Sequence, residues 1–565
     1  MPQPLHPSSD SDRLAGLFSF LSGSLVSSLF QYHPNDAGTS SFLPPLDWSD
    51  WWDWAGADQT HGHDGDIRAD SWYSLLQYYD WCRITPESGM DEQPPDVAAT
   101  IPRTLRTLIE NASRLALLRE LGTVVSPCSG TESRSSPQEA VAMLRPSASG
   151  GSSTPVVGIS PKKAHEVTQM SDFIGIMLHS DPSLSSIEHV VDVGAGQVCD
   201  SFTPSHSAGA YLSRTLRDSI GLHVLALDFS DVQTQGAAKR DAVKPKRKAA
   251  LNDPADSSGA GHATAEQMHS EPKIHEPRHG SLTYVTTAID ADTLRSSTHN
   301  WMEREVVMGS VTEKPISTQD RVEQGPAPVL FVALHACGSL TPNILRAFAS
   351  EARSGKTGAA AWTPRAAVIV GCCYNMLRPE DFPLSSELRS LSGATAALSP
   401  SHLQLAAQVP SQWTRTEDTL RDARLALRKI VWRALIQDVL DGEKKNIALE
   451  ETTDGRPTKK RLGRLNDAAY ADWATFAQRV QTKRGLPDGR LVRADRALER
   501  RIAVFHVLRC IVGPVIESLL LLDRTLWARE ALQGTGLDVE LVNMFDQASG
   551  SGRNVAIVIR PGIAR

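Results

Sequence analysis

The sequence lacks the features that mark several broad classes of protein. Its 565 residues include only seven cysteines, an odd number that is scattered along the chain, unlike the disulfide framework of a small secreted domain. The formal net charge of −7 is small for this length, so no general attraction to nucleic acid is expected. No run reaches the roughly 18 apolar residues of a membrane span.

The N-terminal segment also differs from a signal peptide. It has no basic stretch, and Asp10 and Asp12 precede its apolar part. These absences predict a protein of a reducing compartment, the cytoplasm or the nucleus, with no secretion signal and no association with membranes. They leave the oligomeric state open.

Short apolar runs predict an α/β core. Five runs, apolar on both faces, are typical of buried strands at 189–193, 223–228, 282–287, 328–334 and 366–371. Helical or long crossover segments separate them, which favours a parallel sheet covered on both sides. Near the C-terminus, the runs 537–547 and 553–561 predict a hairpin that completes the same sheet.

The other segments are helical or polar. Residues 1–125 look helical and hold six of the twelve tryptophans, which indicates either the core of a helical subdomain or a surface on which bases stack. Residues 126–155 have the composition of a linker. The predicted core spans 156–411, with extra loops at 198–209, 236–280 and 290–328. A helical insert at 412–534 then separates it from the terminal hairpin at 535–565.

The first predicted strand ends in a glycine turn, VVDVGAGQ, that suits a nucleoside ligand. A strand, the turn Gly194-Ala195-Gly196 and a helix bring backbone N–H groups and a helix N-terminus to a polar or anionic ligand. A dinucleotide fingerprint needs a third glycine three residues after the second. Cys199 stands there, so NAD is disfavoured.

An acid that accepts from ribose hydroxyls is expected about 20 residues beyond such a turn. Asp228 ends the second predicted strand, 34 residues after Gly194 (228 − 194), and about 22 remain when the 12 residues 198–209 are removed. We therefore interpret 198–209 as a loop extruded from the turn. The sequence leaves open whether this loop is a surface excursion, a lid or an artefact of the gene sequence.

Six motifs together resemble a known family. They are SPKKAHEV (160–167), VVDVGAGQ (190–197), YLSRTL (211–216), ALHACGSLTPNILRAF (333–348), VGCCYNML (370–377) and FDQASGSGRN (545–554). Their order resembles the methyltransferase-domain family of methyltransferase-like protein 25 and the ribosomal RNA adenine dimethylase domain-containing proteins. The resemblance implies a class I, Rossmann-like methyltransferase sheet that binds S-adenosylmethionine. The HACGSLT and CCY motifs are also similar to those of a tRNA ribose methyltransferase family, an analogy that points to RNA as the substrate.

This resemblance implies a set of cofactor-binding residues. Gly194 to Gln197 would contact the methionine part of the cofactor, Asp228 the ribose and Phe229 the adenine. The whole predicted set is Asp192, Gly194, Ala195, Gly196, Gln197, Asp228, Phe229 and Leu334.

The predicted catalytic residues are His335, Tyr374 and Cys372. His335 would take a proton from the methyl-accepting group, or only hydrogen-bond a neighbouring loop. Tyr374 could stack on an acceptor base. Cys372 and Cys373 close the fifth strand and, with Cys337, have some character of a metal site. Buried packing is the default for such thiols, however, and no metal is predicted.

The predicted substrate-binding residues are Lys162, Lys163, His165, Arg553 and Asn554. The first three precede the first strand on a predicted helix, where they could approach a phosphate or the cofactor carboxylate, or be ordinary charges on an exposed face. Arg553 and Asn554 follow the turn of the terminal hairpin.

The sequence thus predicts an S-adenosylmethionine-dependent methyltransferase with RNA as a possible partner. The Asp/Asn-Pro-Pro-Tyr motif of adenine-N6 methyltransferases is missing from the strand end where it is expected, so dimethylation of adenine is not expected. A protein or small-molecule methyltransferase, and a cofactor-binding scaffold without activity, are the alternatives.

Overall fold

The computed structural model describes residues 9–57, 70–88, 93–119, 124–126, 159–196, 210–230, 280–312, 326–354, 361–392, 398–446, 462–487, 489–491 and 495–562. Two compact units are present: Met1–Leu117 with Phe382–Asp523, and Leu118–Asp381 with Arg524–Arg565. The predicted loop 198–209 and nearly all of 236–280 lie outside the described residues.

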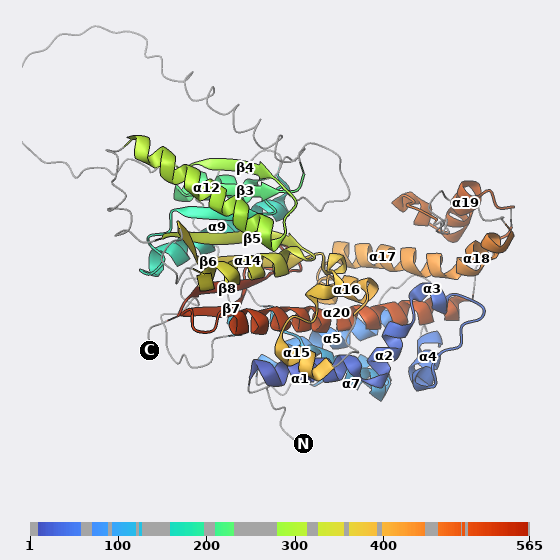
Figure 1. The fold of residues 1–565 in the computed structure, drawn as a ribbon. Helices are drawn as coiled ribbons and strands as arrows, with labels where there is room; N and C mark the ends of the chain where they lie inside the picture. The colour runs from blue at the N-terminus through green and yellow to red at the C-terminus, as the bar shows by residue number, and fades with distance from the viewer. Residues whose placement is uncertain are drawn as a thin grey trace, which may run out of the picture. The chain divides into compact units, whose positions relative to one another are not determined.

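The second unit is built on a mixed sheet of eight strands in the order β1-β7-β8-β6-β5-β2-β3-β4 (Figure 1). Neighbours among β2 to β6 are parallel, and β8 runs antiparallel to both β6 and β7. The strands are β1 (Val124–Ser126), β2 (His189–Val193), β3 (His223–Asp228), β4 (Leu282–Thr286), β5 (Ala327–Cys337), β6 (Trp362–Cys372), β7 (Leu537–Asn543) and β8 (Val555–Pro561).

This sheet confirms the predicted fold class. All five predicted internal strands form, and the two terminal runs pair as a hairpin whose second strand joins β6. Apart from the three-residue β1, which is antiparallel to β7, β8 is the one strand reversed in a parallel array, and this is the arrangement of a Rossmann-like methyltransferase sheet. The carboxyl ends of β2, β3, β5 and β6 therefore meet at one edge, where open α/β sheets bind their ligands.

Helices cover both faces of the sheet. On one face, α9 (Pro161–Ser180) and α10 (Tyr211–Thr215) pack their apolar side chains onto alternate residues of the strands, such as Val190 and Val332. On the other face, α14 (Leu340–Ser354) places Phe348 edge-on against Phe331 of β5, with 5.9 Å between ring centroids.

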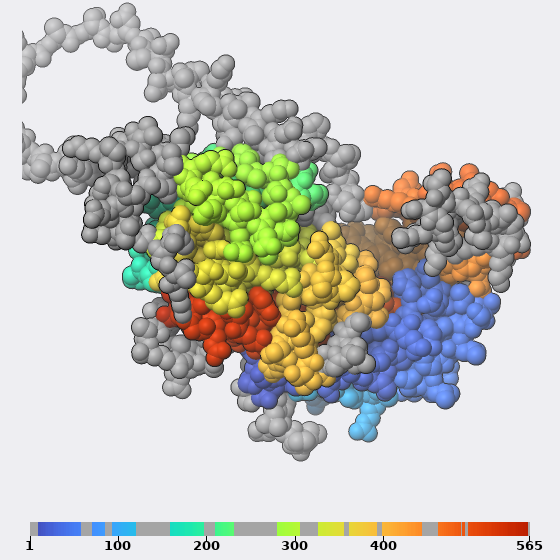
Figure 2. Space-filling model, in the orientation of Figure 1, coloured from blue at the N-terminus to red at the C-terminus, as the bar shows by residue number. Residues whose placement is uncertain are grey.

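The prediction of a loop at 290–328 is wrong for its first part, which forms α12 (Ala291–Thr312). Asp290 caps this helix, because its carboxylate accepts from the backbone N–H of Thr293 at 2.8 Å while Thr293 Oγ1 accepts from the N–H of Asp290. Leu294 and Trp301, seven residues apart and thus on one helix face, are buried. The helix lies beside α14 (Figure 2). Nε of Arg295 on α12 donates to Glu351 at 2.6 Å.

The first unit is helical and joins two segments that are far apart in the sequence. The N-terminal segment contributes α1 (Asp10–Ser22), α2 (Ser24–Gln31), α3 (Pro34–Ala37), α4 (Ser49–Gly56), α5 (Ser71–Ser88), α6 (Val97–Thr100) and α7 (Arg103–Leu115). The later segment contributes α15 (Ser386–Ser392), α16 (Pro400–Leu405), α17 (Glu417–Leu435), α18 (Gln437–Asn446), α19 (Trp473–Arg484) and most of α20 (Arg496–Ala531).

Four of the six tryptophans of the N-terminal segment are buried in this helical unit: Trp48, Trp51, Trp52 and Trp72. Trp48 and Trp51 are completely buried, and Trp48 packs on Phe505 of α20 with ring centroids 4.8 Å apart. The Nε of Arg501, also on α20, donates to the carbonyl of Trp52 at 2.9 Å. Of the two interpretations of the aromatic cluster, the structure favours the core.

By length and composition, α20 could cross a membrane, and the bent pair α1–α2 passes the same test if it is counted as one span. The apolar window of α20 is 89% buried inside the protein, as in the central helix of a globular unit. Within the described residues, no other helix meets these criteria.

Candidate functional site

The glycine turn after β2 is bonded to the end of β3. The backbone N–H groups of Gly194 and Ala195 both donate to the carbonyl of Leu227, at 2.8 and 3.1 Å. Gly194 has φ +80°, a conformation that L side chains rarely adopt, which explains the need for glycine. The backbone N–H of Gly196 then donates to Oδ2 of Asp228 at 3.0 Å.

Asp228 therefore lies beside the turn, as the spacing predicts. Its other oxygen, Oδ1, accepts from the backbone N–H of Ser230 at 2.8 Å. Burial raises the pKa of this carboxyl group, while the backbone bonds from Ser230 and Gly196 oppose the shift. The backbone N–H of Phe229 also acts on this carboxylate, and since a carboxylate offers about four acceptor positions, capacity for a further donor remains. The next side chain, Phe229, is 64% exposed.

Asp192 faces the helix that follows the turn. Its Oδ2 accepts from the hydroxyl of Ser213 on α10 at 2.5 Å, and the side chain is 2% exposed. Burial raises the pKa of Asp192 to about 6, against the Ser213 bond and the charge of Lys163. This predicted cofactor residue thus holds α10 against β2.

The two ends of the interruption in the turn meet. The backbone N–H of Ala210 donates to the carbonyl of Ala195 at 2.6 Å, and α10 begins at Tyr211. Ala210 itself has φ +62°, the left-handed conformation. Strand, turn and helix are therefore contiguous in space. Gln197, a predicted cofactor residue, lies outside the described residues.

His335 lies at a shift of register between β5 and β6. Ala333 pairs with Ile369, but Ala336 pairs with Gly371, so β5 has one residue more than β6 between these two pairs. Such an irregularity changes the direction of a side chain locally. The preceding residue, Leu334, remains buried at 6% exposure and belongs to the core cluster under α9.

His335 is bonded to an acid from another element. Its Nε2 lies 3.0 Å from Oε2 of Glu166 on α9, and Glu166 is 2% exposed. Burial lowers the pKa of His335, and Lys163 and Arg553 add to this effect while Glu166 opposes it. Burial alone would raise the pKa of Glu166, but the bond to His335 and the nearby lysines lower it overall.

An ionised Glu166 beside a neutral imidazole assigns the ring proton of His335 to Nε2, which donates to the carboxylate. Nδ1 then carries the lone pair. Among the described residues, Nδ1 has no hydrogen-bond partner. The pair has the arrangement of a base whose ring is oriented by a carboxylate.

The predicted substrate-binding residues divide into two groups. Lys163 lies near Asp192, Glu166 and His335, and Arg553 lies near His335, since the charges of these cations act on the pKa values of the site. Lys162 is exposed at the start of α9, and the Nε2 atom of His165 is buried without a hydrogen-bond partner.

Asn554, by contrast, is fully buried and serves the fold. Its amide nitrogen donates to the carbonyls of Phe545 and Arg119, at 2.8 and 3.4 Å. These bonds hold the connection between β7 and β8. A contact from this amide to substrate would break them, so its position does not support the predicted role.

The position of Tyr374 does not support stacking on a base. Its ring is 1% exposed, and the guanidinium of Arg524 lies 5.3 Å from the ring centroid. A base cannot reach a ring that is covered in this way. Cys372, 3% exposed, lies against Cys337 with 3.0 Å between the sulfur atoms.

Glu166 lies on the predicted helix with Lys162, Lys163 and His165, but its bond to His335 is the part of the site that the sequence prediction missed. A signal for it exists in the sequence, because Glu166 shares a helical stripe with the buried residues Met170, Phe173 and Met177. A charged residue on an otherwise apolar stripe needs a partner inside the protein. The identity of that partner, His335, has no local signal.

A large cavity lies elsewhere in the molecule. It has a volume of about 1300 Å³ and lies in the helical unit, where His33, Asp422, Arg433 and Arg509 are among its lining residues. None of the predicted site residues lines it. The cavity and the sheet edge therefore belong to different units.

Comparison with known proteins agrees with the sheet and its edge. The profile of a family described as "Methyltransferase domain" matches residues 162–380. Probable methyltransferase-like protein 25 of Homo sapiens is 24% identical over 225 residues, which cover 36% of this chain and 32% of that protein. The Mus musculus protein of the same name is 24% identical over 239 residues, 38% of this chain and 35% of its own length.

The matched segment thus spans about a third of these curated relatives. No solved structure matches the chain.

Proposed function

We propose that this protein, whose residues 162–380 carry a methyltransferase domain, transfers a methyl group from S-adenosylmethionine to RNA. One observation carries the proposal. The backbone N–H of Gly196 and the carboxylate of Asp228 are 3.0 Å apart at the carboxyl edge of the sheet. Turn and acid therefore converge where one nucleoside could bind both.

The residues at this edge fit the cofactor. Asp228 keeps acceptor capacity beyond its backbone bonds, which suits the hydroxyl groups of a ribose. Phe229, immediately after it, exposes an aromatic ring that can pack on an adenine. Gly194 and Ala195 hold the turn so that its backbone faces the methionine part.

When bound, S-adenosylmethionine supplies an electrophilic methyl carbon, whose bond to sulfur breaks as its bond to the acceptor forms. The chain itself contributes position and a proton acceptor. Nδ1 of His335 can accept the proton that the acceptor atom loses, while Glu166 keeps the imidazole oriented through Nε2.

The choice of RNA rests on charge and on the motif analogy. Lys163 and Arg553 bring positive charge to the surroundings of His335, as phosphate recognition requires. The HACGSLT and CCY motifs are similar to those of a tRNA ribose methyltransferase family. The five described cysteines are all thiols, which supports a reducing compartment, the cytoplasm or the nucleus.

Calorimetry of the full chain with S-adenosylmethionine and S-adenosylhomocysteine tests the cofactor. We expect both to bind, and binding without any methyl transfer would favour the inactive scaffold. If neither ligand binds the folded protein, the methyltransferase proposal fails.

Transfer of a tritiated methyl group tests the acceptor. The protein is incubated with labelled S-adenosylmethionine and either total RNA or total protein, and we expect label in the RNA. A His335→Ala variant serves as the control for label that does not depend on this site. Label confined to protein would reject RNA while keeping the enzyme.

A further inference from the structure

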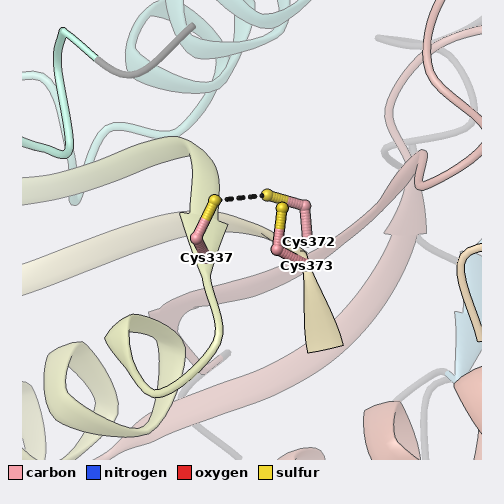
Figure 3. Close-up of side chains that lie close together, drawn as sticks. All are labelled: Cys337, Cys372 and Cys373. Carbon is pink, nitrogen blue, oxygen red and sulfur yellow. Dashed lines mark hydrogen bonds between the residues drawn. The ribbon is translucent and has the colours of Figure 1, made fainter. Parts of the chain in front are cut away.

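Three cysteine thiols meet where β5 and β6 end (Figure 3). Cys337 is the last residue of β5, Cys372 is the last of β6, and Cys373 follows directly. The sulfur atoms of Cys337 and Cys372 are 3.0 Å apart, and all three sulfur atoms lie within 4.8 Å of one another. None of the three cysteines belongs to the glycine turn or to the acid that the cofactor would bind, although β5 and β6 end at the same edge of the sheet.

Two residues with left-handed backbone conformations, Gly338 and Cys373, lie where the thiols come together. Cys337 and Cys372 are directly paired in the parallel ladder. Gly338 leaves β5 with φ +53°, and a Cβ there would come within 2.6 Å of the carbonyl oxygen of Met376. Only glycine permits so close an approach of the two chains.

Cys373 has φ +47°, the left-handed conformation, which is rare for a residue with a side chain. Ala210 is the one other such residue outside glycine in the described part of the chain. A strained residue of this kind is a reason to look for function. Here it places a third sulfur beside the first two, and Cys373 is partly exposed, so burial in the core does not explain the conformation.

We propose that Cys337, Cys372 and Cys373 bind one thiophilic metal ion, Zn²⁺ or Cu⁺, as three thiolates. A metal–sulfur bond of about 2.3 Å requires sulfur atoms roughly 3.8 Å apart in such a site. The sulfur atoms of Cys337 and Cys372 are closer than this value, at 3.0 Å, and no pair of the three is more than 4.8 Å apart. Small side-chain rotations would complete the geometry.

The surroundings agree with this assignment. Binding releases a proton from each thiol and leaves the complex with excess negative charge. The guanidinium of Arg524, stacked on Tyr374 next to Cys373, offsets part of that charge. Among the described residues, no fourth histidine, cysteine or carboxylate joins the cluster. Cu⁺ would be satisfied by three sulfurs, whereas Zn²⁺ would hold an exchangeable fourth ligand.

The test uses the full chain, stripped of metal with a chelator under reducing conditions. Cys128 and Cys199, which lie outside the described residues, are first replaced by serine so that they cannot contribute. Zn²⁺ and Cu⁺ are then titrated separately against a chromophoric competitor. We expect one equivalent of at least one ion to bind, and a higher melting temperature of the protein with that ion.

Variants assign the ligands. Cys372→Ser or Cys373→Ser should weaken binding by about a hundredfold or more, beyond the 10–100-fold typical of changes in the outer shell of a metal. Cys373→Ser is the milder change, since Cys373 is the only partly exposed member. Cys82→Ser, a buried thiol of the helical unit, is the matched control and should bind as before.

Two results would overturn the proposal. One is the absence of stoichiometric binding of either ion to the folded parent protein, or equal binding by the Cys373→Ser variant. The other is a Cys337–Cys372 disulfide in protein isolated under thiol-blocking conditions, which would show that the sulfurs serve redox chemistry. Neither result depends on methyl transfer, so this test stands apart from that of the proposed function.

Discussion

Replacement of Asp228 by asparagine tests whether the sheet edge binds a nucleoside. Within the protein, the carboxylate accepts from the Gly196 N–H at Oδ2 and from the Ser230 N–H at Oδ1, and the Phe229 N–H also acts on it. The remaining acceptor positions would receive the ribose hydroxyls. Asparagine keeps the size of the side chain but has a single acceptor oxygen, so it cannot accept from both backbone groups.

The magnitude follows from this count. A hydrogen bond to a charged group contributes about 1.5–3 kcal/mol, so we expect cofactor affinity to fall about 10- to 150-fold. One backbone N–H also loses its acceptor, which should lower the free energy of unfolding by about 1–3 kcal/mol.

The assay is calorimetry with S-adenosylhomocysteine, at a temperature where thermal unfolding shows that both proteins are folded. Asp172→Asn, on the exposed side of α9, is the matched control for loss of a carboxylate and should bind normally. A folded Asp228→Asn variant with unchanged affinity would refute the placement of the ribose.

Three further predictions concern the same unit. Burial raises the pKa of Asp192 from its ordinary 3.8 to about 6 in the folded protein, so its contribution to stability is complete below pH 3.8 and is lost as pH rises through 6. Asp192→Asn keeps an oxygen that can accept from Ser213. Its free energy of unfolding at pH 8 should therefore exceed that of the parent protein by about 2–3 kcal/mol. Denaturant unfolding at pH 4 and pH 8 measures this, and the same difference at both pH values would contradict the prediction. His335→Ala should lose turnover in the tritium assay yet keep S-adenosylhomocysteine affinity, and Glu166→Gln should lower turnover less; equal rates in all three proteins would remove the pair from the mechanism. Phe348→Ala, at a completely buried ring, should cost about 3–5 kcal/mol in chemical denaturation, and a loss below 1 kcal/mol would contradict the packing of α14 on β5.

The sheet could be predicted because its strands are buried on both faces. Runs such as 189–193 and 223–228 are apolar throughout, and their bounds agree with β2 and β3. The same reasoning wrongly predicted a loop for the first part of 290–328, because the sequence of α12 is polar overall. Its cap at Asp290 and Thr293 was the better signal, because capping is local and independent of packing.

The candidate site was predictable where it depends on strand ends. The glycine turn follows β2 and Asp228 ends β3, and these strands are parallel neighbours. Their contact can therefore be predicted from the order of the strands alone. The bond between Glu166 and His335 joins residues 169 positions apart and depends on how α9 lies across the sheet. Likewise, no local pattern joins Trp48 to Phe505, although their contact makes one helical unit from two segments.

The bond between the Ala195 carbonyl and the Ala210 N–H has a practical consequence for protein engineering. It joins two residues that are 15 positions apart in the sequence, at the edge of the sheet where the cofactor is proposed to bind. The entropic cost of lengthening a closed excursion grows only with the logarithm of its length. A fluorescent label placed between these two residues would thus lie next to the proposed cofactor site, where it could report binding.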